Sequence, residues 1–136
     1  MNNFILLVFL IVIFLWYLYK FNIENYMETE PTISRLKNLL LPHFPELKKV
    51  KLMKDNASYT INKSKIYICT ESDGKIYDDN MLIFVILHEL AHTMCKSIGH
   101  GDEFQTIFKE LLMRAENVGI YDPSLPRVEN YCNTKK

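Results

Sequence analysis

The most informative stretch of this sequence is HELAHTMCKSIGHGDEF, residues 88–104. It contains three of the four histidines, with Glu89 between His88 and His92 and with His100 eight residues further on. Positions i and i+4 of an α-helix lie one turn apart on the same face, so the first two imidazoles can reach one metal ion. Imidazole nitrogen is a common ligand of zinc, and a catalytic zinc site uses three protein ligands and a water. The spacing therefore predicts a helix that binds Zn²⁺ through His88 and His92.

Glu89 and His100 are the candidates that complete this site. Glu89 lies one position round the helix from His88, where it can take a proton from water instead of binding the metal. His100 follows Gly99, which lets the chain reverse, and it is the expected third ligand. Other candidates for that position are Cys95, Asp102, Glu103 and Glu110. Asp102 and Glu103 are better explained by helix capping, and Cys95 is better explained as a buried core residue. Without a metal, the two motif histidines would be core residues satisfied by other polar partners.

Two helices are predicted around the motif. Residues 80–98 begin with an almost wholly apolar run, which is typical of a buried central helix, and Gly99 is placed to end it. Asp102 is expected as the N-cap of the next helix, with Gln105 completing a capping box, and Gly119 ends that helix. Its apolar residues fall at helical spacing and predict one buried face: Phe104, Ile107, Phe108, Leu111, Leu112 and Ala115.

The residues before the motif predict a helix and a small sheet. A helix introduced by Pro31 is stopped by the PHFP segment at 42–45, where His43 is expected in a loop. Three β-like runs follow, joined by residues typical of tight turns, at 50–54, 58–62 and 65–70. Such turns favour an antiparallel meander, and ESDGK at 71–75 is a further turn. Together with the motif helices, this order predicts an α+β fold.

A continuous apolar segment, FILLVFLIVIFLWYLY at residues 4–19, precedes the predicted domain. As a helix it would span about 24 Å, slightly less than the hydrocarbon core of a bilayer. Its last residues include three aromatic side chains that suit the membrane interface, and Lys20 can extend its ammonium group towards water. A cleaved signal peptide and a buried soluble helix are the alternatives, but a basic start and a small-residue cleavage site are missing from the segment. We therefore expect a single-pass membrane anchor over residues 1–20, an acidic tether over 21–30 and the folded domain over 31–136.

Charge and cysteine content bear on the compartment. Lys20 lies on the domain side of the apolar segment, so the positive-inside rule favours a cytoplasmic domain on the strength of one charge. The sequons Asn56-Ala-Ser and Asn62-Lys-Ser are short enough to arise by chance, but they offer a test of this topology. Three cysteines without CxxC spacing argue against a disulfide framework and favour a reducing compartment. The 16 basic and 16 acidic residues balance, so nucleic acid is not expected as a partner.

HELAH followed by GHGDEF resembles the WLM and SprT-like zinc metallopeptidases, in which HExxH is completed by a histidine in an H-x-x-x-F context. The matching positions are His88, Glu89, His92, His100 and Phe104, and the order of helix, small sheet and motif helix is also similar over residues 33–120. The resemblance implies a minimal zincin fold and peptide-bond hydrolysis. It also implies that the KIYICT strand lines the cleft and pairs with an extended substrate.

The sequence thus predicts a membrane-anchored zinc metallopeptidase that acts on protein or peptide substrates and contacts the bilayer through residues 4–19. A non-catalytic, zinc-stabilised binding module tethered to a membrane is the main alternative, and a metal-free interaction protein is another. Three good ligand candidates rather than four favour an open site over a structural one. Tyr121 or Tyr131 could donate a hydrogen bond to an oxyanion.

Overall fold

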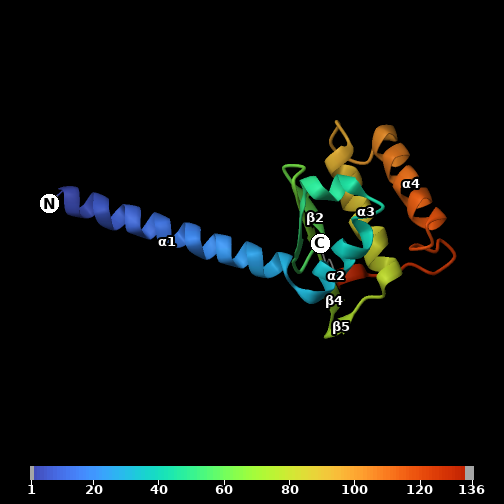
Figure 1. Cartoon of the computed structure of the whole chain (residues 1–136), viewed down its shortest axis with the longest axis horizontal. Helices are drawn as coiled ribbons and strands as arrows, with labels where there is room; N and C mark the ends of the chain where they lie inside the picture. The colour runs from blue at the N-terminus through green and yellow to red at the C-terminus, as the bar shows by residue number, and fades with distance from the viewer. Residues whose placement is uncertain (1, 134–136) are drawn as a thin grey trace.

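The computed structural model describes residues 2–133 and shows a mixed α+β fold from which one long helix projects (Figure 1). This helix, α1 (Asn2–Glu28), is uninterrupted and has no buried residue. By its length and composition it could cross a membrane. A signal sequence has the same two properties. The first residue of the predicted anchor and residues 134–136 of the predicted domain lie outside the described residues.

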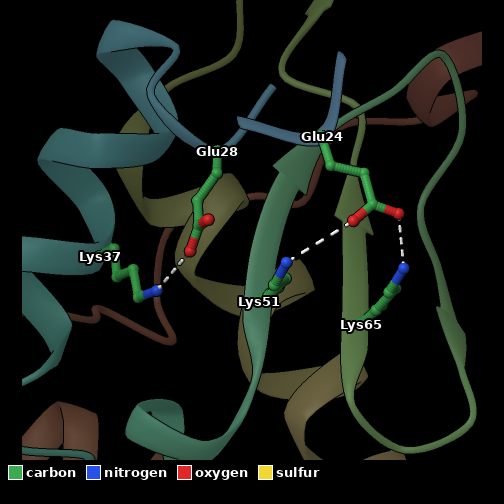
Figure 2. A network of polar contacts seen from close by, with 5 residues as sticks. All are labelled: Glu24, Glu28, Lys37, Lys51 and Lys65. Atoms are coloured by element: carbon green, nitrogen blue, oxygen red, sulfur yellow. Dashed lines mark hydrogen bonds and ion pairs between the residues drawn. The ribbon is translucent and has the colours of Figure 1, made fainter. Parts of the chain in front are cut away.

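The segment predicted as an acidic tether is helical, and its acids pair with the domain (Figure 2). The Glu24 carboxylate bridges Lys51, at 3.5 Å, and Lys65, while Glu28 lies 3.1 Å from Lys37. Half-exposed ion pairs contribute only about 0–1 kcal/mol each, so they orient α1 more than they stabilise the fold. We call these five residues the α1 clamp. The clamp makes the junction between α1 and the domain a folded contact instead of a free tether.

The sheet has three strands, as predicted, but the predicted meander is wrong. The strands β1 (Lys51–Lys54), β2 (Tyr59–Ile61) and β3 (Lys65–Ile68) lie in the order β1-β3-β2. β3 is parallel to β1 and antiparallel to β2, so β2 is an edge strand.

The connection between β1 and β2 explains this order, because it passes over the end of β3. The Asp55 N–H donates to the Ile68 carbonyl at 3.0 Å, and the Cys69 N–H donates to Ser58 Oγ at 2.9 Å. These two bonds carry the chain across β3, so β2 pairs on its far side and not with β1. Turn residues alone did not reveal that crossing.

The core lies between the sheet and the helices, both those that precede it and those that follow it. α2 (Pro31–Leu40) and the short helix η1 (Pro45–Lys49) precede the sheet, and the hairpin β4 (Glu71–Ser72) and β5 (Lys75–Ile76) occupies the predicted turn. α3 (Asp79–Met94) is the buried central helix, as predicted. Burying each large aliphatic side chain contributes about 1.5–3 kcal/mol, and the fully buried set comes from α2, η1, the three-stranded sheet and α3, with none from the β4–β5 hairpin. It includes Ile33, Leu36, Leu52, Ile66, Ile68, Leu82 and Ile86.

The last helix, α4 (Asp102–Asn117), begins without the predicted capping box. Its N-cap is Gly101, with no side-chain cap bond, and Asp102 is its first residue. Gln105 instead donates to the His100 carbonyl at 3.4 Å. The carboxylate of Asp102 still lies at the positive end of the helix dipole. Gly119, at φ 77°, ends the helix as predicted, because it takes a left-handed conformation that favours glycine.

Cys69 and Cys132 form a disulfide, so the expectation of none is wrong. Their Cα atoms are 6.3 Å apart, within the usual range for a bridged pair. The C-terminal segment is held against the sheet by Tyr131, whose hydroxyl donates to the Cys69 carbonyl and whose ring packs 4.9 Å from that of Tyr77. Cys95 is buried and unpaired. The odd cysteine count was misleading because one buried thiol takes no part in the bridge.

Cys132→Ser is expected to lower the free energy of unfolding by about 4 kcal/mol, because the bridge joins positions 63 residues apart and restricts the unfolded chain. Thermal unfolding followed by near-ultraviolet circular dichroism in detergent micelles measures this loss. Reductant should lower the stability of wild type to the same extent and leave that of Cys132→Ser unchanged. Equal stability of oxidised wild type and the variant would contradict a stabilising bridge.

Candidate metal centre

The three histidines predicted as ligands meet at one point. His100 Nε2 lies 3.0 Å from His92 Nε2 and 3.2 Å from His88 Nε2. One ligand nitrogen from each residue lies within 4.8 Å of the other two. Two ligands of a tetrahedral ion at 2.0–2.1 Å are separated by about 3.3 Å, which is close to the distances from His100 Nε2 to the other two nitrogens. The three residues are therefore close enough to hold a metal ion.

A loop at residues 95–101 brings His100 back to α3. The helix ends at Met94 and not at Gly99 as predicted. Lys63, in the turn between β2 and β3, explains the earlier end, because its ammonium group donates to the first two carbonyls of this loop. Gly99, at φ 94°, then allows the reversal that places His100 over the helix.

An aromatic layer from α4 lies beneath the three imidazoles. The Phe104 ring centroid is 5.0 Å from His88, 4.4 Å from His92 and 4.8 Å from His100. Phe104 is only 1% exposed, and Phe108 adds a second ring 5.1 Å from His88. These contacts restrict the rotation of the imidazoles and keep their nitrogens convergent. They give a packing role to the phenylalanine that the sequence resemblance singled out.

The imidazoles of α3 are held in the form that binds metal. Burial, followed by the neighbouring His92 and His100, lowers the pKa of His88 to about 4. Burial, followed by His100, also lowers the pKa of His92. Both rings are therefore neutral at pH 7, with a nitrogen lone pair available to a cation.

Glu89 lies beside this cluster and is not one of the converging ligands. Glu89 is 7% exposed, and its carboxylate accepts a hydrogen bond from Thr60 Oγ1 at 2.8 Å. Burial raises the pKa of Glu89, while the Thr60 hydrogen bond and the charge of His100 oppose that rise. A buried carboxylate with a raised pKa is suited to accept a proton during a reaction.

Thr60 is the functional candidate that sequence reasoning missed. It also donates to the Glu89 carbonyl at 3.2 Å, so it contacts both the backbone and the side chain of the candidate base. Its neighbours Tyr59 and Ile61 point to the other face of β2. The alternation in residues 58–62 puts the apolar Tyr59 and Ile61 on one face and Thr60 on the polar one, so the sequence carried no signal that Thr60 would face a partner 29 residues away.

The three histidines and Glu89 border one open cleft of about 640 Å³, a size typical of ligand sites. The strand that lines it is β2, through Tyr59 and Thr60, and the expectation that KIYICT would do so is wrong. Both edges of β3 are already paired, whereas β2 has a free edge. The loop after α3 adds Ser97, Ile98 and Gly99 to the lining, and the residues that flank β2 add Ser58, Asn62 and Lys63.

The alternative ligands lie outside the cluster. Within residues 2–133, the group that could hold a metal consists of the three histidines alone. Cys95 is buried beside Ser97 Oγ, 3.2 Å away, and Glu103 accepts the Lys96 N–H at 3.0 Å. His43 is exposed in its loop, as predicted.

The two tyrosines considered as oxyanion donors make other contacts, although Ser58, the partner of Tyr131, itself borders the cleft. The Tyr131 hydroxyl contacts Ser58 Oγ at 2.8 Å and the Cys69 carbonyl, and Tyr121 stacks on Phe84 with centroids 6.3 Å apart. Neither belongs to the described residues that line the cleft.

For the peptide hydrolysis that the sequence predicts, Thr60→Val is expected to lower kcat by about 10–100-fold, because it removes a hydrogen bond to a charged group worth about 1.5–3 kcal/mol. Valine matches the shape of threonine, so the strand should be retained. Thr60→Ser keeps the hydroxyl and should restore most of the rate. Steady-state kinetics of both variants measure the effect, and equal activity of the valine and serine variants would exclude a positioning role for the hydroxyl.

Comparison with known proteins finds relatives in viruses. The chain is 48% identical over 87 residues to uncharacterized protein 136R of Invertebrate iridescent virus 6, covering 61% of this chain and 49% of that protein. It is 49% identical over 86 residues to uncharacterized protein 042R of Invertebrate iridescent virus 3, covering 62% and 54%. It is 34% identical over 109 residues to uncharacterized protein R325 of Acanthamoeba polyphaga mimivirus, covering 74% and 51%.

No family model and no solved structure matches the chain. The chain spans about half the length of the curated relatives it matches. Their names assign no activity, so the geometry of the site itself has to support any function. By sequence, the chain is similar to parts of proteins from two invertebrate iridescent viruses and a mimivirus.

Proposed function

We propose that this chain is a membrane-anchored zinc metallopeptidase that hydrolyses peptide bonds in protein substrates. The observation that carries the proposal is the convergence of three imidazole nitrogens beside a buried carboxylate in an open cleft. His88, His92 and His100 would hold the ion. When bound, zinc supplies Lewis acidity, which makes water more acidic and polarises a peptide carbonyl.

Glu89 has the properties of the general base in this proposal. Its carboxylate accepts one proton from the attacking water, whose oxygen forms a bond to the carbonyl carbon. The C–N bond then breaks, and the proton held by Glu89 passes to the leaving amine. Thr60 orients the carboxylate through the 2.8 Å hydrogen bond, so that its other oxygen remains available to water.

The free edge of β2 supports an extended peptide as the substrate. An edge strand presents unpaired N–H and C=O groups that a peptide can join as an additional strand. Because Thr60 of β2 contacts Glu89, a peptide along this edge would run beside the candidate base. The cleft volume of about 640 Å³ accommodates a few residues of such a peptide.

The α1 clamp supports a substrate close to the bilayer. Glu24 follows Lys20 by one helical turn, about 6 Å along the axis. Lys65, its partner in the clamp, pairs with Ile61 at the end of β2, next to Thr60. The clamp thus joins the end of the proposed anchor to β3, the strand that pairs with β2 beside the cleft, and we infer that the enzyme cuts proteins held near the same membrane.

A structural zinc site is the competing interpretation. Such sites are usually closed by four protein ligands, whereas three ligand residues converge within the described part of the chain. The open cleft leaves room for water and substrate. These features favour catalysis over a zinc-stabilised binding module.

The full chain in detergent micelles, stripped of metal and then titrated with Zn²⁺, tests the proposal. Metal analysis should give one zinc per chain, and fluorescently labelled β-casein, used as an unfolded probe, should be cleaved only after zinc is added. A chelator should stop cleavage, and a second addition of zinc should restore it. Stoichiometric zinc without cleavage would support the binding module, and no zinc would overturn both interpretations.

A further inference from the structure

We propose that the folded domain lies on the oxidising side of the membrane that α1 crosses, and that Asn56 and Asn62 are N-glycosylation sites. This inference rests on the anchoring proposed for α1 and is independent of the proposed catalytic role. Two features carry it, and neither is a candidate ligand or base of the metal centre: the disulfide, and the exposure of both sequons.

The disulfide is an integral part of the domain. Cys69 is 4% exposed, its carbonyl accepts the Tyr131 hydroxyl, and the Cys132 N–H donates to the Tyr77 hydroxyl at 2.7 Å. Hydrogen bonds thus hold the backbone on both sides of the bridge. Disulfides persist in oxidising compartments and are rare where glutathione and thioredoxin keep thiols reduced.

The opposing indication is a single charge. Lys20 favours a cytoplasmic domain, but a bias of one lysine is a weak determinant of orientation. The fold brings together two cysteines that are 63 positions apart, and this disulfide is a more specific indication of the compartment than the single lysine. We therefore place the domain on the side where that bridge can form.

Both sequon asparagines are exposed in connections between strands. Asn56 lies between β1 and β2, and Asn62 lies in the turn between β2 and β3 at φ 50°. Neither belongs to the buried core, so a bulky, hydrated glycan can be attached at either position without disturbing packing. Exposed asparagines in an oxidising secretory compartment meet the conditions for this modification.

The modification is a transfer from a lipid-linked oligosaccharide diphosphate. The asparagine Nδ2 forms a bond to C1 of the first sugar while the bond from C1 to the phosphate oxygen breaks. The nitrogen loses one proton, and the lipid diphosphate leaves. Asn62 lines the cleft, so a glycan there would stand at the mouth of the metal centre, whereas Asn56 lies at the opposite end of β2.

Expression of the full chain in insect cells, followed by glycosidase treatment and electrophoresis, tests the assignment. Wild type should gain mobility on treatment, Asn56→Gln and Asn62→Gln should each gain less, and the double variant should not change. Asn117→Gln is the matched control, because this exposed asparagine is outside any sequon and its replacement should leave the wild-type shift unaltered. No shift in wild type, or a shift retained by the double variant, would overturn the proposal. Complete loss in one single variant would overturn the assignment of the other asparagine.

Maleimide labelling of denatured protein from the same cells tests the compartment separately. One thiol, that of Cys95, should react before reduction, and all three should react after it. Three reactive thiols without reductant would place the domain on the reducing side. Neither readout requires bound metal or activity, so these results and those of the zinc and casein experiment can fail independently.

Discussion

Glu89→Gln is expected to bind zinc as tightly as wild type but to hydrolyse peptide bonds about 10²–10⁴-fold more slowly, the usual contribution of a positioned acid or base. Glutamine keeps the shape of the side chain and can still pair with the Thr60 hydroxyl, which lies 2.8 Å from Glu89 Oε2. It cannot accept the proton of the attacking water. Because Glu89 is outside the group of converging ligands, its replacement should leave the metal in place.

Zinc titration and casein cleavage on the same preparation measure the two properties together. Glu110→Gln is the matched control, since this exposed acid on α4 lies outside the cleft and its loss should change neither property. Retained cleavage in Glu89→Gln would assign the proton transfer to another group. Loss of zinc from this variant would show that the carboxylate is itself a ligand.

His100→Ala is expected to lower zinc affinity by at least about a hundredfold, because even partners that only support a ligand account for about 10–100-fold. His100 supplies one of three converging nitrogens, 3.0 and 3.2 Å from the other two. Since His100 is exposed, alanine leaves no buried cavity, and the metal-free variant should fold normally. At a fixed excess of zinc, a hundredfold loss removes about 2.7 kcal/mol of metal-dependent stabilisation.

His43→Ala provides the control for this experiment. Both histidines are exposed and lie in loops, but only His100 belongs to the cluster. Isothermal titration with Zn²⁺ and thermal unfolding with and without the metal should separate the two variants. Unchanged affinity in His100→Ala would mean that the third ligand lies elsewhere in the chain, and equal losses in both variants would indicate an unspecific effect of removing an imidazole.

Much of the candidate site could be predicted from local spacing. The four-residue interval between His88 and His92 requires only helical geometry to place both imidazoles on one face, and Gly99 indicates the reversal before His100. The apolar run of α1 and the amphipathic pattern of α4 likewise follow from side-chain periodicity. In each case the decisive contacts are local, at most 12 positions apart along the chain, so the spacing of the residues indicates them.

The tertiary structure alone decided the features that depend on distant partners. Thr60 reaches Glu89 across 29 positions, and Lys63 ends α3 from a turn in the sheet. Strand order depends on hydrogen bonds that carry one connection over the end of β3, and the disulfide depends on the C-terminal segment folding back to the sheet. Spacing along a chain fixes neighbours on a helix or strand, whereas pairing between elements is selected by the packing of the whole core. The sequence by itself therefore determined the candidate ligands and base, and the packed fold determined what orients the base, which strand borders the cleft and how the proposed anchor is attached.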